Sequence, residues 1–166
     1  MDCLIAYDYG LAAVGIALIF SMLLDFKHMR IPNSAPVVIL SAFIIVWALE
    51  PQTVAPIEAR LMSALGMLFV TFAMFSFGVL GAGDSKLLAA LGLWLPLEVL
   101  LPYLLIMALY GAGLSVVSLM LKRRKIPKAW SAQSVWLARL SDGKSVVPYG
   151  IAIGGGFWTV WAMGLI

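Results

Sequence analysis

The chain has 166 residues, of which 63% are hydrophobic and 11% are charged, with a formal net charge of +3. A soluble domain of this length could not bury so much apolar surface, so the composition excludes an ordinary soluble protein and indicates one embedded in a lipid bilayer. The single cysteine excludes an internal disulfide and a zinc site built from cysteines.

Uncharged apolar runs follow one another along the whole chain. A helix rises about 1.5 Å per residue and needs roughly 17–25 residues to cross a bilayer. All of the runs meet or approach that length except the fourth, which is short. The runs cover residues 9–24, 31–49, 61–83, 87–97, 99–121 and 145–166.

Lysine and arginine are sorted between the loops. All of them except Arg60 follow the first, third or fifth run. Positively charged loops stay in the cytoplasm, so this pattern predicts an all-α bundle of about six transmembrane helices with both termini outside. Because Lys86 and the basic residues 122–125 must share the cytoplasmic side, the short run 87–97 is predicted to cross the membrane as well. We expect a protein that crosses the membrane several times.

The domain organisation is simple. Residues 1–166 are predicted to form one transmembrane domain, and residues 122–147 a cytoplasmic loop. A helix over 129–140 would lie in the headgroup layer, because its apolar side chains share one face. That face carries Trp130, Trp136, Leu137 and Leu140, with Ser131, Ser134 and Arg139 away from it.

Two aspartates carry most of the chemical information. Asp25 closes the first apolar run in the segment DFKHMRIPN, and Asp84 follows a glycine-rich turn in GAGDSKLLAALG. A carboxylate at the edge of a hydrocarbon layer is costly and usually has a function. Taken alone, Asp84 could simply cap the helix that begins near Ser85, and Asp25 could pair with the basic residues that follow it.

Both acids are predicted to lie at the cytoplasmic ends of spans, and there they can act as a pair. Two carboxyl groups within a few Å of each other share a proton and titrate together. The ionised group can take a proton from water while the protonated one polarises a peptide carbonyl. A metal hydrolase fits poorly, since His28 is the only histidine and no His-Glu-x-x-His motif occurs. No metal or other cofactor is expected.

The sequence resembles the type IV prepilin peptidases, which are membrane aspartic proteases of the GxGD group. The resemblance is carried by DFKHMRIPN at 25–33, LGAGDSKLLAALGLW at 80–94 and VPYGIAIGGG at 147–156. It is closest to the short members associated with tight-adherence (Flp-type) pili. Larger members have a four-cysteine zinc domain and also methylate the new N-terminus. This chain has neither those cysteines nor an inserted domain, so metal is not expected and methyl transfer is in doubt.

The resemblance implies roles for particular residues. Asp25 and Asp84 would be the catalytic pair, and Gly81 and Gly83 would form the flexible turn. Lys86 corresponds to a basic residue that the family usually has two places after the second acid. Binding of substrate or support of the loop is assigned to Gly81, Gly83, Lys86, Pro32 and Asn33.

The resemblance also implies a substrate. It would be a prepilin or pseudopilin precursor, cut on the cytoplasmic side between a short basic leader and an apolar helix. The expected partners are these precursors and the bilayer, and no nucleic acid. The location that the resemblance implies is the bacterial cytoplasmic (inner) membrane, with the active site on the cytoplasmic side. Two other functions remain open: a small transporter or proton-relay protein that uses the same acids, and a non-catalytic assembly partner that binds apolar helices.

Overall fold

The computed structural model describes residues 5–54, 56–122, 133–144 and 146–166, and every regular element in these ranges is helical. The predicted all-α fold is therefore confirmed. In chain order the elements are α1 (Ile5–His28), α2 (Ser34–Leu49), the short 3₁₀ helix η1 (Pro51–Thr53), α3 (Ile57–Ser76), α4 (Ala82–Gly92), α5 (Leu97–Lys122), α7 (Val135–Ser141) and α8 (Tyr149–Ala162).

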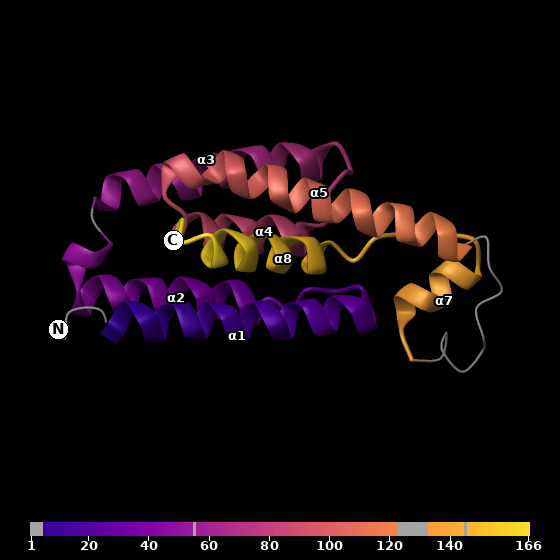
Figure 1. Ribbon diagram of the computed structural model, residues 1–166, viewed down its shortest axis with the longest axis horizontal. Coiled ribbons are helices and arrows are strands. Elements are labelled where there is room, and N and C mark those ends of the chain that lie inside the picture. The colour runs from indigo at the N-terminus through magenta and orange to yellow at the C-terminus, as the bar shows by residue number, and fades with distance from the viewer. Residues whose placement is uncertain (1–4, 55, 123–132, 145) are drawn as a thin grey trace.

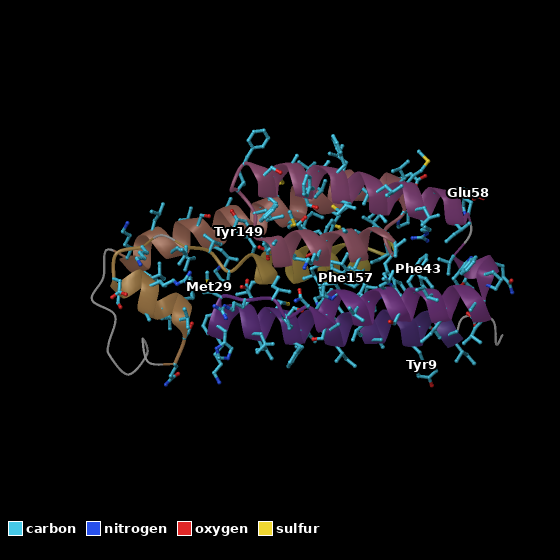
Figure 2. The ribbon with its side chains drawn as sticks, turned by 180° about the vertical axis from the view of Figure 1, so that it is seen from behind. Tyr9, Met29, Phe43, Glu58, Tyr149 and Phe157 are labelled. Atoms are coloured by element: carbon cyan, nitrogen blue, oxygen red, sulfur yellow. The ribbon has the colours of Figure 1, made fainter. Side chains whose placement is uncertain are left out.

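The α-helices other than α7 run along the long axis of the molecule in three layers (Figure 1). α1 and α2 form one outer layer, α3 and α5 form the other, and the shorter α4 and α8 lie between them. Their directions alternate along the chain, so the C-terminal end of α1 and the first turns of α2, α4 and α8 lie at one end of the bundle. Figure 2 shows Met29 and Tyr149 toward this end, and Tyr9 and Glu58 toward the other.

Proline and residues with positive φ set the helix boundaries. Pro56, Pro96 and Pro148 directly precede α3, α5 and α8, where a missing N–H and a fixed φ suit a first turn. α3 ends before Gly78, which has a φ of 70°. α1 ends before Met29, which has a φ of 54° although it is not glycine, and whose N–H donates to the Asp25 carbonyl at 2.8 Å. The chain therefore reverses directly beside Asp25.

Among the described residues, α1, α3 and α5 are long and apolar enough to cross a bilayer. α2 has 16 residues, α4 has 11 and α8 has 14. Many large apolar side chains on the outer helices face outward, as expected where lipid rather than water surrounds them. The chain is thus a helical membrane protein. Six complete spans and the orientation with both termini outside stay predictions, and α4, at about 16 Å, is too short to cross alone.

The core is closely packed where α4 finishes. Trp94 is 1% exposed, and its indole N–H donates to the Ile39 carbonyl at 3.1 Å. Its ring meets Phe43 edge to face, with centroids 5.8 Å apart. A Cβ atom on Gly10 of α1 would lie 2.5 Å from this indole, so only glycine fits there. This packing fixes the last turn of α4 against α1 and α2.

The predicted loop helix is present in part. α7 begins at Val135, and residues 129–132 of the predicted segment lie outside the described ranges. Trp136 and Leu140 are buried, in agreement with the predicted apolar face. Ser134 differs from the prediction because it is buried too, with its hydroxyl donating to the Phe26 carbonyl of α1. α7 therefore packs against the end of α1, and its place in the headgroup layer stays a prediction.

Candidate active site

A pocket of about 290 Å³ opens at the end of the bundle where α1 finishes and α4 starts. It contains both aspartates singled out in the sequence, although 59 positions separate them in the chain. Three segments build it: the last turn of α1, the residues that follow that helix, and the glycine-rich turn before Asp84. The pocket is lined by Asp25, Met29, Arg30, Ile31, Gly81, Ala82, Gly83 and Asp84.

Asp25 is held by the first turn of α8. Its side chain is only 6% exposed, and its Oδ2 accepts a hydrogen bond from the Gly150 N–H at 2.7 Å. Gly150 is the second residue of α8, so its N–H has no partner within the helix and is free to donate outward. A Cβ atom at Gly150 would lie 3.0 Å from Asp25 Oδ2. Any larger residue would therefore crowd the carboxylate, and glycine leaves room for the contact.

Asp84 is partly buried in the first turn of α4, three residues after Gly81. Its Oδ2 accepts a hydrogen bond from the Gly81 N–H at 3.1 Å, so Asp84 does help to cap its own helix. A Cβ atom at Gly81 would lie 2.7 Å from that oxygen, and one at Gly83 would lie 3.2 Å from the Ile31 Cβ. The two glycines therefore let the turn pass close to the carboxylate and to the segment after α1.

The two acids influence each other electrostatically. Burial raises the pKa of Asp84 to about 6, the negative charge of Asp25 adds to this rise, and the Gly81 N–H acts in the opposite direction. A carboxyl group with such a pKa can carry a proton at a pH where an ordinary aspartate is ionised. At a pH near 6 the Asp84 carboxyl group can therefore either carry or release a proton, which is the property that acid/base chemistry needs.

The residues beside Asp84 anchor the start of α4. The Ser85 hydroxyl donates to Thr71 Oγ1 of α3 at 3.0 Å in a buried contact, and the Thr71 hydroxyl donates to the Met67 carbonyl. Lys86 points the other way, and its Nζ lies 3.4 Å from Asn33 Oδ1. This long contact joins the N-terminal part of α4 to the residue that precedes α2.

The predicted site residues thus fall into two groups. Asp25, Asp84, Gly81 and Gly83 line one pocket. Pro32, Asn33 and Lys86, predicted to bind substrate or support the loop, lie beside the pocket rather than in its lining.

Sequence reasoning missed the part of the site that α8 supplies. Gly150 lies in the quoted segment 147–156, but no role was assigned to it, because a backbone donor leaves no chemical signature in a sequence. Met29, Arg30 and Ile31 also line the pocket. They belong to the segment 25–33, in which the sequence pattern indicated Asp25 as a site residue but did not indicate that these three residues line the same pocket. Within the described ranges, no cluster of three or more His, Cys, Asp or Glu side chains could hold a metal ion.

The fold and the pocket together define a class of protein: an α-helical membrane protein with two carboxyl groups facing one cavity at an end of its bundle. The sequence model of the type IV leader peptidase family matches residues 12–116. The chain belongs to this family, which makes it a peptidase with type IV leader peptidase-like activity and prepilins as the implied substrates.

The family match covers both acids and ends before α8. Neither a curated protein nor a solved structure matches the chain significantly.

Proposed function

We propose that this protein is an aspartic endopeptidase that removes the basic leader from Flp-type prepilins at the cytoplasmic face of the bacterial inner membrane. Asp25 and Asp84 form the catalytic pair in this proposal. The observation that carries it is the meeting of these two carboxyl groups in one pocket, in a chain whose family cleaves leaders. No metal or other cofactor takes part.

The surroundings of the two acids support different roles. The Gly150 N–H, at 2.7 Å from Asp25 Oδ2, stabilises a carboxylate there and so offsets part of the cost of burying its charge. Asp84 keeps a proton more readily, since its pKa is raised by burial and by the charge of Asp25. Asp25 is therefore assigned as the general base and Asp84 as the general acid.

The reaction follows from these roles. Asp25 takes a proton from a water molecule as its oxygen attacks the peptide carbonyl, and Asp84 gives its proton to the carbonyl oxygen. In the resulting tetrahedral intermediate, Asp25 passes its proton to the nitrogen as the C–N bond breaks. A hydroxyl of the intermediate returns a proton to Asp84. The leader leaves with a new carboxyl group, the mature protein has a new amino terminus, and one water is consumed.

The position of the pocket suits this substrate. The acids lie at one end of the bundle rather than at its middle (Figure 1). The charge rule places this end in the cytoplasm, beside Lys27 and Arg30. A precursor with its apolar helix in the bilayer would present the peptide bond before that helix at this depth.

The test is a cleavage assay in membranes. The protein is co-expressed with a tight-adherence prepilin, and the mass of the precursor is followed for wild type, Asp25→Asn and Asp84→Asn. We expect wild type to shorten the precursor and each Asn variant to lose at least about 1,000-fold in rate, because each removes an essential proton donor or acceptor. Membrane insertion is checked for every variant.

Asp142→Asn is the matched control, because Asp142 is exposed after α7 and lies outside the pocket. It should cleave like wild type. Full activity of either pocket variant would refute the dyad. If wild type leaves the precursor intact while the protein carries protons across proteoliposome membranes, the transport alternative replaces this proposal.

A further inference from the structure

A second cavity lies beside the acid pocket, on the side of the bundle where α2, α3 and α4 meet. It is a groove of about 460 Å³ whose walls are almost entirely apolar. α4 forms its floor, while α2 and α3 form its walls. The side chains on the walls project outward, and Leu65 of α3 is 63% exposed. The groove is therefore open sideways, toward the surroundings of the bundle.

The groove begins where the acid pocket ends. Asp84 and Ile31 line the pocket, and Lys86 and Asn33, two residues further along each segment, line the groove. From there the groove follows α4 for seven residues to Leu93, which is about 10 Å of helix. A segment leaving the acids along α4 would enter this groove directly. By contrast, the groove between α1 and α2 runs to Glu50 at the far end of the bundle.

The floor of the groove is made of small side chains. Ala89 and Ala90 of α4 and Ala64 of α3 all line it. In membranes, small residues let two helices approach closely, and van der Waals packing then drives their association. α4 lies between the outer layers of α1–α2 and α3–α5 (Figure 1), and it is a short helix, with 11 residues. The stretch of α4 that lines the groove, about 10 Å, matches the length of about two helical turns.

The near end of the groove carries the polar groups. Lys86 and Asn33 face each other there, and the other lining residues are apolar or alanine. A peptide being cut must be extended at the acids, and its backbone groups near the membrane edge then need hydrogen-bond partners. The ammonium and amide groups of this pair can supply donors where an extended segment changes into a helix.

We propose that this groove is the docking site of the substrate: the first two turns of the precursor's apolar helix pack on α4 between α2 and α3. Lys86 and Asn33 contact the extended residues between that helix and the cleaved bond. The inference rests on the proposed function, and it adds where the substrate binds and from which side it enters. The helix arrives laterally from the bilayer, and the leader stays at the acid pocket.

Cross-linking tests the position directly. Cys3→Ser removes the single natural cysteine, and Asp84→Asn prevents turnover. Leu65→Cys is then paired with single cysteines placed along the precursor's apolar segment. We expect disulfides at precursor positions spaced three or four residues apart, within its first two turns. Leu109→Cys is the matched control, because Leu109 is 72% exposed on α5 and lies outside the groove.

Filling the groove tests its importance for cleavage. Ala89→Leu places a larger side chain on the floor. We expect kcat/KM for the membrane-borne precursor to fall about tenfold further than kcat/KM for a short peptide that spans the cut but lacks the apolar helix. Ala108→Leu, the same change on an exposed part of α5, should give no such difference between the two substrates.

The outcomes separate the two proposals. Cross-links at Leu65→Cys but not Leu109→Cys, together with the selective loss in Ala89→Leu, would support docking in the groove. Equal cross-linking at both positions, or none at Leu65→Cys while wild type cleaves the precursor, would overturn the docking site and leave the proposed activity intact. Failure of wild type to cleave any precursor would overturn the activity, and the docking site with it.

Discussion

The two ends of α4 are built in opposite ways. Just after its C-terminal end, Trp94 is buried and its indole N–H donates a hydrogen bond. Gly10 of α1 packs so closely on this ring that a Cβ atom there would clash with it. At its N-terminal end, Asp84 lines an open pocket together with Met29 and Asp25. Met29 has a left-handed backbone conformation, and the Asp25 carboxylate accepts a hydrogen bond from one backbone N–H. Packing around Trp94 holds α4 in position. The other end of the helix can therefore carry an accessible carboxyl group without having to contribute most of the stability.

The largest expected effect comes from breaking the packed end. Trp94→Ala should lower the free energy of unfolding by about 3–5 kcal/mol, since it leaves a large cavity and removes the indole hydrogen bond to the Ile39 carbonyl. Thermal unfolding in detergent measures this change. Trp161→Ala is the control because Trp161 is 48% exposed, and it should cost far less. Equal losses of unfolding free energy from both variants would contradict the idea that packing at Trp94 holds α4 in position.

The next effect concerns the catalytic end. Gly150→Ala would place a methyl group 3.0 Å from Asp25 Oδ2 and push the carboxylate from its N–H. We expect the cleavage rate to fall about 100-fold, close to 2.7 kcal/mol in the barrier, with little change in melting temperature. Gly113→Ala is matched, because nothing lies within 4 Å of a Cβ atom there. A Gly150→Ala enzyme that cleaves normally would show that α8 does not position Asp25.

A smaller effect should appear in the pH dependence of stability. The pKa of Asp84 is raised from its ordinary 3.8 to about 6, so the folded protein binds a proton more tightly than the unfolded chain. Stability should therefore fall as the pH rises from about 4 to about 6 and then level off. Because the side chain is partly exposed, we expect a loss on the order of 1 kcal/mol, or roughly 2–4 °C in melting temperature.

Asp84→Asn should flatten this dependence, and Asp142→Asn should retain it. Melting temperatures at pH 4, 5, 6 and 8 make the comparison. A slope that persists unchanged in Asp84→Asn would assign the titration to another group.

Much of this arrangement could be predicted from the sequence. Long apolar runs indicate membrane helices regardless of how they pack, and the sorting of lysine and arginine placed Asp25 and Asp84 at the same end. The helix boundaries were harder to predict. α4 begins at Ala82 and ends at Gly92, whereas the apolar run covers 87–97, because glycine and proline set the ends of a helix independently of hydropathy.

The contribution of α8 could not be predicted in the same way. Gly150 lies 125 positions from Asp25, and its functional group is a backbone N–H that every residue except proline has. What makes it special is the close approach, which depends on how α1 and α8 pack. In the sequence, Gly150 is noticeable only as part of the segment 147–156. That segment indicates the family resemblance but not the contact between Gly150 and Asp25.

The gathering of α2, α4 and α8 at the acid end has an electrical consequence. All three helices begin beside the pocket, and each first turn carries a partial positive charge of about half a unit from its aligned peptide dipoles. Their combined field would favour the oxyanion that develops on a peptide under attack in this pocket. Because that field comes from the backbone, mutation of the neighbouring lysines and arginines would leave most of it in place.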